Sequence, residues 1–198
     1  AINSLRVAFL KDDYEQHDRN HVNDSLTLAV LDSMGIDPVP VSLPSSLPVN
    51  SLRIILSAEA AAAFDELTRT NRDTLLVRQD KRAWPNSFRK SRFIPAVEYI
   101  QANRLRQILI MQMDSLMKKF DVVIAPTSGG NQLLITNLTG HPCVVVPNGF
   151  NKNGHPTSIC FLGNLYDEGT VLILAQKYQE VTTFDEQHPP LFFPQKNH

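Results

Sequence analysis

The sequence predicts an α/β fold. An apolar strand, an amphipathic helix and a second strand follow one another near the N-terminus, which is the β-α-β order of such folds. A continuous apolar run at Asp121–Pro126 and a hairpin signal further along add strands for the same sheet. The chain has 198 residues, of which 42% are hydrophobic and 20% charged. It can therefore bury a core, either as one domain or as a large piece of a bigger one.

The N-terminal β-α-β segment is defined by two apolar runs and a helical spacing between them. Leu5–Leu10 is predicted as a short buried strand, and His21–Met34 has apolar residues at steps of three and four. Gly35 is placed to end this helix. Ile36–Leu43 follows as a second strand, and its two prolines place it at an edge of the sheet.

The middle of the chain is predicted to be mainly helical. Ser51 is expected to cap a helix that passes through the alanine-rich Ala58–Ala63 and ends near Leu67. Asn71–Arg92 is polar and mixed, and it is expected to be irregular, with Trp84-Pro85-Asn86 as a break.

The strongest predicted helix covers Ile94–Lys119. Its apolar stripe is typical of a buried helix face. The stripe comprises Leu105, Ile108, Leu109, Met113, Leu116 and Phe120.

The C-terminal part supplies the remaining strands. Asp121–Pro126 is apolar throughout, as expected of a strand buried on both faces, and loop 127–131 follows at its carboxyl end. That end of an open α/β sheet is where ligands bind. Cys143–Pro147 and Thr157–Leu162 form a predicted hairpin with an Asn-Gly turn between them, and Asp167–Thr183 is a final helix. The tail at 188–191 is expected to be extended.

Composition excludes several function classes. The formal net charge is −1, so neither a nucleic-acid footprint nor a polybasic membrane patch is expected. The longest apolar stretch, near 54–64, is too short to span a membrane, and the N-terminus has no signal-peptide pattern. Two cysteines form no disulfide framework, which favours a cytoplasmic location. The 8 glycines form no nucleotide-binding or Gly-x-Ser-x-Gly motif.

Three small clusters are candidates for chemistry. His17 and His21 are four residues apart and would share a helix face, but no third metal ligand follows, so solvated charges explain them as well. His141 and Cys143 are near in sequence and raise the alternative of a thiol enzyme against that of an inert buried cysteine. Ser128, beside two glycines, is expected to line a pocket, although the local sequence places no base next to it.

Segments spread over nearly the whole chain resemble one enzyme family. They are Leu5–Asp12, Leu56–Leu67, Trp84–Arg106, Asp121–Gly130, Thr136–Phe150 and Pro156–Gln179. The pattern Asn-Leu-x-Gly-x-Pro at 137–142, followed by an apolar strand and Gly-x-Pro, is specific in combination. Together these segments resemble the C-terminal half of amidase-signature enzymes, which include bacterial amidases and the A subunit of glutamyl-tRNA amidotransferase. The resemblance implies that the chain is part of that family's mixed β-sheet, covered by helices.

The resemblance also implies where the chemistry lies. The family hydrolyses amides through an acyl-serine intermediate with a Ser-Ser-Lys triad in a Gly/Ser-rich region, which this chain lacks. The expectation is therefore a C-terminal portion with no catalytic residue, inactive alone, whose complete enzyme takes a small amide substrate and needs no metal or organic cofactor. By matching segments, Ser128, Gly129, Asn131 and Phe161 are expected to form one wall of the substrate pocket.

Substrate and partners follow from the same comparison. The tRNA-dependent members carry an acidic residue shortly before the Asn-Leu-x-Gly-x-Pro segment, and residues 129–132 contain none, which favours a general amidase over a glutamine-specific one. A portion of a larger fold should expose apolar surface, so self-association into a homo-oligomer is expected. Two alternatives remain open: a self-standing, non-catalytic α/β binding module, and a thiol hydrolase that uses Cys143.

Overall fold

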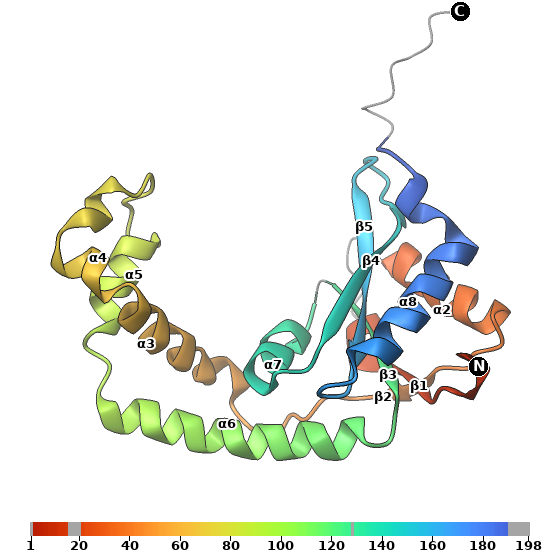
Figure 1. The fold of residues 1–198 in the computed structure, drawn as a ribbon, viewed down its shortest axis with the longest axis horizontal. Helices are drawn as coiled ribbons and strands as arrows, with labels where there is room; N and C mark the ends of the chain where they lie inside the picture. Colours follow the sequence, from red (N-terminus) through yellow and green to blue (C-terminus); the bar gives the residue numbers. More distant parts are fainter. Residues whose placement is uncertain (1, 16–20, 128, 190–198) are drawn as a thin grey trace, which may run out of the picture. The chain divides into compact units, whose positions relative to one another are not determined.

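The chain divides into two compact units. The computed structural model describes residues 2–15, 21–127 and 129–189. Unit 1 comprises Ala1–Pro44 and Met111–His198, and unit 2 comprises Ser45–Ile110. The boundary falls inside the long helix α6, Ala96–Met117 (Figure 1). Unit 1 contains the sheet, whereas unit 2 is helical.

A five-stranded mixed sheet forms the centre of unit 1, with strand order β2-β1-β3-β5-β4. Its strands are β1 Val7–Leu10, β2 Val39–Val41, β3 Val122–Pro126, β4 Cys143–Phe150 and β5 Pro156–Gly163. β1 runs parallel to β2 and β3, while β5 runs antiparallel to β3 and β4. The predicted α/β class, the edge position of β2 and the β4–β5 hairpin are therefore confirmed.

Helices α2 and α8 cover one face of this sheet (Figure 1). The helical elements of unit 1, besides the end of α6, are η1 Ile2–Ser4, α1 Lys11–Tyr14, α2 His21–Ser33, α7 Gln132–Thr139, α8 Glu168–Thr182 and η4 Phe184–Glu186. α2 is the crossover between parallel strands β1 and β2. It ends as predicted at Gly35, whose φ of 77° lets the Ile36 N–H donate to the Leu31 carbonyl at 3.0 Å.

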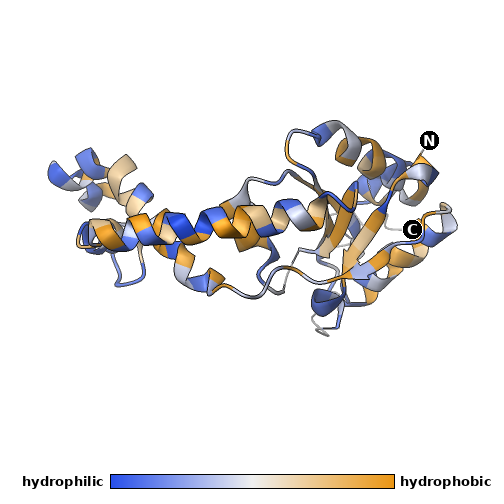
Figure 2. Ribbon diagram, turned by 90° about the horizontal axis from the view of Figure 1, so that it is seen from below, coloured by the Kyte–Doolittle hydropathy of each residue, from blue (hydrophilic) through white to orange (hydrophobic). Residues whose placement is uncertain are grey.

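The core of unit 1 lies between the sheet and these two helices. Alternate residues of the hairpin, including Val146, Ile159 and Phe161, are buried there with residues of α8. The Phe161 ring contacts that of Tyr178, with centroids 5.5 Å apart. The strands are correspondingly the most continuous hydrophobic elements of the ribbon (Figure 2).

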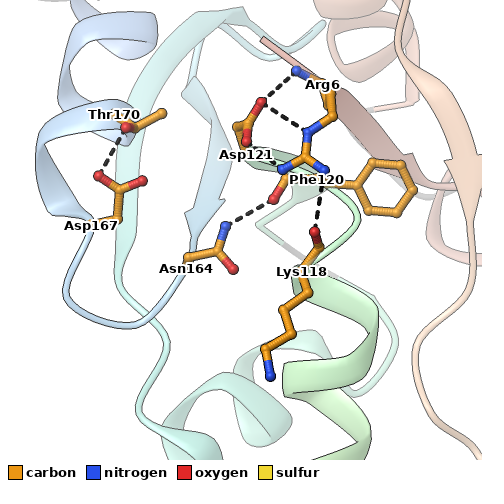
Figure 3. Close-up of polar contacts among 7 residues, drawn as sticks. All are labelled: Arg6, Lys118, Phe120, Asp121, Asn164, Asp167 and Thr170. Carbon is orange, nitrogen blue, oxygen red and sulfur yellow. Dashed lines mark hydrogen bonds and ion pairs between the residues drawn. The ribbon is translucent and has the colours of Figure 1, made fainter.

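Polar contacts fix the starts of β1 and β3 (Figure 3). The Arg6 backbone N–H and its Nη2 each donate to the Asp121 carboxylate at 2.7 Å, and the Asp121 N–H donates back to the Arg6 carbonyl at 2.8 Å. Arg6 Nη1 also donates to the Lys118 carbonyl at the end of α6. Asn164 Nδ2 donates a hydrogen bond to the Phe120 carbonyl at 2.8 Å. These bonds pair the parallel strands in one register.

Unit 2 differs from the predicted continuous helix. Its elements are η2 Val49–Leu52, α3 Arg53–Ala63, α4 Asp65–Arg69, η3 Arg72–Leu75, α5 Trp84–Ser91 and the first part of α6. Ser51 lies inside η2 and does not cap α3, which begins at Arg53. Phe64, with φ of −105° and ψ of 22°, separates α3 from α4, and its ring stacks on Phe88 at 5.0 Å between centroids.

Helix α5 also departs from the prediction. Residues 71–92 were expected to be irregular, with Trp84-Pro85-Asn86 as a break, yet α5 begins at Trp84. Proline suits the first turn of a helix, since its fixed φ is helical and that turn needs no N–H donor. Pro85 therefore starts this helix and does not interrupt it. The prediction of a helix over Ile94–Lys119 is confirmed by α6.

Two features are absent from the described ranges. No described helix combines the length and the apolar character needed to cross a membrane. No group of three or more His, Cys, Asp or Glu side chains in the described part could hold a metal ion. His17, one of the two histidines considered in the sequence, lies outside the described residues.

Candidate functional site

A cavity of about 620 Å³ lies in unit 1 beside the β4–β5 hairpin and α7. This volume is within the range of small-molecule sites. Its lining comes from the end of β3, from α7 and the turn after it, and from one face of the hairpin. The lining residues are Thr127, Gln132, Leu133, Thr136, Asn137, Gly140, His141, Cys143, Val145, Ser158 and Cys160. None of them is Lys, Arg, Asp or Glu, so the cavity has a neutral wall that can form hydrogen bonds.

Strand alternation decides which hairpin residues reach the cavity. Cys143 pairs with Leu162, and Val145 pairs with Cys160, so these side chains share a face of the sheet. The side chains of the intervening pair, Val144 and Phe161, lie on the opposite face of the sheet. The cavity and the core are therefore on the two sides of the same hairpin.

The loop after β3 connects the sheet to α7. Thr127 Oγ1 donates to the Ser158 carbonyl of β5 at 2.9 Å, which holds the start of the loop against the hairpin. Asn131 precedes α7 as its N-terminal flanking residue, and Gly140 ends the helix with φ of 82°. That left-handed turn brings His141 and Cys143 back along the cavity.

The buried imidazole of His141 is neutral, and one of its ring nitrogens is unprotonated. Its side chain is buried, and burial lowers the pKa of the imidazole, although Asp114 opposes this effect; the neutral form is favoured. Thr139 Oγ1 donates its single proton to the Ile135 carbonyl at 2.9 Å, so it must accept from His141 Nδ1, 2.8 Å away. The proton of the neutral ring is therefore on Nδ1. Nε2 has no hydrogen-bond partner and keeps its lone pair.

Two free thiols share the cavity. Cys143 is exposed and Cys160 is buried. A hydrogen bond from the Cys160 thiol lowers the pKa of Cys143, and the same bond together with burial raises the pKa of Cys160. Cys143 is therefore the thiol that ionises first.

Among the four residues expected to form a substrate wall, the structure separates Phe161 from Gly129 and Asn131. Ser128 lies outside the described residues. Gly129 is exposed with φ of 107°, and Asn131 is half-buried at the start of α7, so both lie in the loop at the carboxyl end of β3. Phe161 is fully buried in the core on the other face of the hairpin. None of these described residues is part of the cavity lining.

An aspartate from a different element lies against this loop. A Cβ on Gly130 would collide with the Asp13 carboxylate, so the two are in close contact. Asp13 is buried, its Oδ2 has no hydrogen-bond partner, and burial, with a smaller effect of Asp12, raises its carboxyl pKa. The loop sequence contains no acid, but the folded chain places one beside it.

Unit 2 has a second cavity of about 630 Å³, lined in part by alanines of α3. Its polar and charged side chains pair with one another. Tyr99 donates to Glu59 Oε1 at 3.0 Å, and Arg92 forms an ion pair with Asp65. The cavity beside the hairpin, where Cys143 is exposed and the lining is uncharged, is the stronger candidate for a site.

Part of this site was predictable from the sequence. His141 and Cys143 were singled out because they are near in sequence. Loop 127–131 was also expected at the ligand-binding end of its strand, and its Thr127 lines the cavity. Cys160 was not predicted, because strand pairing brings it there. The alternation of the strand at 157–162 is the signal that could have placed Cys160 and Phe161 on opposite faces.

No family model matches the chain, but curated relatives do. The A subunit of the glutamyl-tRNA(Gln) amidotransferase of Oceanobacillus iheyensis is 25% identical over 231 aligned positions, covering 96% of this chain and 47% of that protein. Its counterpart in Bordetella avium is 26% identical over 202 positions, covering 82% of this chain and 40% of that protein.

Solved structures share the fold. The peptide amidase of Stenotrophomonas maltophilia superposes with a TM-score of 0.77 and 19% identity, covering 98% of this chain and 45% of the amidase. A bacterial aryl acylamidase of the amidase-signature family gives a TM-score of 0.70 and 14% identity, covering 92% of this chain and 44% of its own. The chain thus spans less than half the length of these proteins. In sequence and in fold, it matches the C-terminal portion of amidase-signature enzymes.

Proposed function

We propose that this chain is the C-terminal portion of an amide-bond hydrolase whose Ser-Ser-Lys triad lies upstream, and that the chain alone is inactive. The observation that carries the proposal is the superposition on a peptide amidase over 98% of the chain. The complete enzyme would cleave a small amide through an acyl-serine intermediate, with no metal or organic cofactor.

The described side chains support a role as scaffold and wall. Ser33, Ser57 and Ser115 each donate to a carbonyl of their own helix, which occupies the hydroxyl proton. A serine nucleophile instead needs a base at its hydroxyl. Gly129 and Asn131 are the proposed substrate contacts, since they lie at the carboxyl end of β3, with Ser128 between Thr127 and Gly129 as a further candidate. Phe161 would support the wall from the core.

A general amide is the proposed substrate class. Binding the ammonium group of glutamine needs a carboxylate in the wall, and loop 127–131 has none. Asp13 touches this loop from α1, but burial raises the pKa of its carboxyl, so it ionises less readily than a solvated carboxylate would. Glutamine hydrolysis by the complete protein at a rate comparable to that of its best simple amide would contradict this assignment.

The cellular setting is proposed on the same basis. Both cysteines are free, which fits a reducing compartment such as the cytoplasm. Several large apolar side chains are exposed in unit 2, among them Val77, Trp84 and Phe93. We expect the upstream portion to cover such surface in the complete enzyme, and the lone chain to self-associate. Size-exclusion chromatography that finds a monodisperse monomer would argue against that expectation.

Turnover measurements test the proposal. The 198-residue chain and the protein extended through its upstream coding sequence are assayed with one panel of simple amides. Activity in the extended protein only is the expected result. Hydrolysis by the lone chain that is lost in Cys143→Ser would support a thiol hydrolase instead. Saturable amide binding without turnover in either protein would support a non-catalytic binding module, for which the neutral cavity of about 620 Å³ is the supporting observation.

A further inference from the structure

The cavity beside the β4–β5 hairpin contains a pair of inequivalent thiols that the proposed amide chemistry does not use. Cys143 begins β4 and is exposed, whereas Cys160 lies inside β5 and is buried. Both line the cavity. The neighbouring Cys160 lowers the pKa of Cys143, so the exposed thiol of the pair is the one that ionises more readily and can act as a nucleophile.

The positions of the two cysteines on the hairpin limit what they can form together. Cys143 is opposite Leu162, and Cys160 is opposite Val145, so the thiols are diagonal neighbours. Diagonal Cα atoms in an antiparallel pair are about 7–8 Å apart. A disulfide needs Cα atoms within about 7 Å, so bridging the two cysteines would require the strands to move. Cys143 can reach a sulfur atom of a ligand without such a movement.

The rest of the lining indicates what kind of ligand fits. No lining residue carries a full charge, so the binding of a neutral ligand buries no charged side chain without a partner. Ser158 and Asn137 add groups that both donate and accept.

We propose that this cavity is a modification site, in which Cys143 forms a mixed disulfide with a small neutral thiol that carries a hydroxyl or amide group. The co-reactant is a low-molecular-weight disulfide. The Cys143 thiolate attacks one of its sulfur atoms, a bond forms between Cys143 Sγ and that sulfur, and the original S–S bond breaks. Cys143 is oxidised, the departing thiolate is reduced, and the thiolate takes a proton from water. Excess small thiol reverses the exchange.

The test uses 2-hydroxyethyl disulfide as the probe and intact-protein mass spectrometry as the readout. The native chain is expected to gain one mercaptoethanol, located on Cys143 by peptide mapping, at least tenfold faster than the same chain in urea. Oxidised glutathione is the charged comparison. After normalisation to a free model thiol, it is expected to react more slowly with the native chain than the neutral probe does.

Variants separate the parts of the site. Cys143→Ser should abolish the fast reaction. Cys160→Ala should raise the pKa of Cys143. Each pKa unit of that rise should slow the reaction about threefold, because the tenfold loss of Cys143 thiolate is partly offset by the higher nucleophilicity of the thiolate that remains.

Three results would overturn the proposal. They are a native rate no higher than the rate in urea, a label found on Cys160, or an intramolecular disulfide as the product. Because the comparison of native and unfolded chains needs no variant, it decides the question even where a substitution impairs folding.

Discussion

Replacing Phe161 by alanine should destabilise unit 1 far more than truncating Val145, an exposed residue on the opposite face of the same hairpin. The ring is fully buried and contacts Tyr178 of α8. Removing a buried phenylalanine side chain costs about 3–5 kcal/mol, because apolar contacts are lost and a cavity remains. Small domains have stabilities of about 5–15 kcal/mol, so this is a large share of the total.

The matched control is Val145→Ala. Val145 is one position from the partner of Phe161 along β4, yet its side chain is 55% exposed and faces the cavity. Its truncation should cost less than about 1 kcal/mol. Urea unfolding followed by far-ultraviolet circular dichroism measures both. With a slope of about 2 kcal/mol per molar urea, the Phe161→Ala midpoint should fall by about 2 M.

Equal and small effects of the two substitutions would refute the assignment of faces. Phe161 would then be a wall residue, as the sequence resemblance implies, and would not be a core residue. A change in the slope without a change in the midpoint would show that the denatured state, and not the core, had been altered.

Three further changes test other parts of the structure by the same unfolding assay. Gly130→Ala should destabilise the protein by about 1–3 kcal/mol, because a φ of 53° is strained for alanine and the new Cβ would meet a buried carboxylate. The control Gly169→Ala, with open space around it, should be neutral or stabilising by up to about 1 kcal/mol. Asp121→Asn should lower stability at neutral pH. Arg6 lowers the pKa of Asp121, so the contribution of this carboxylate is present above about pH 4 and is lost as pH falls through the folded-state pKa. Arg89→Met should cost about 1–3 kcal/mol, since it leaves the carboxylate of Asp73, which is 1% exposed, without the guanidinium 2.6 Å away.

Each of these predictions has a contrary outcome. Equal effects of the two glycine substitutions would mean that the loop is not held against Asp13. A difference between wild type and Asp121→Asn that persists unchanged at about pH 2 would mean that the carboxylate charge is not what stabilises the strand starts. An Arg89→Met variant as stable as the wild type would show that Asp73 is solvated in the folded protein.

Local signals in the sequence predicted most of unit 1. The β-α-β segment was predictable because a strand, an amphipathic helix ended by glycine and an edge strand marked by prolines each carry their own signature. The hairpin was predictable from its Asn-Gly turn. These elements agree with the tertiary fold, so nothing overrides the local preference.

Unit 2 was harder to predict because its boundaries depend on packing. The break between α3 and α4 falls at Phe64, whose ring stacks on Phe88 of a later helix of the chain. The start of α5 was missed because a proline can either end a helix or begin one, and the local sequence does not distinguish these cases.

The site depends on contacts that no local pattern contains. Cys160 joins Cys143 through strand pairing, and Asp13 reaches Gly130 from the element after β1. The protonation of His141 follows from a chain of two hydrogen bonds through Thr139. Alternation alone shows that Cys160 and Phe161 lie on opposite faces, but only the packing of α8 shows which face is the core.

Covalent trapping of the acyl-enzyme site tests the central claim most directly. The protein extended through its upstream coding sequence is treated with a fluorophosphonate, which labels activated serines, and the label is located by peptide mass spectrometry. A label on a serine upstream of this chain, with the 198-residue chain unlabelled, is the result that the central claim predicts. A label on a serine within the 198 residues, accompanied by loss of amide hydrolysis when that serine is replaced by alanine, would contradict it.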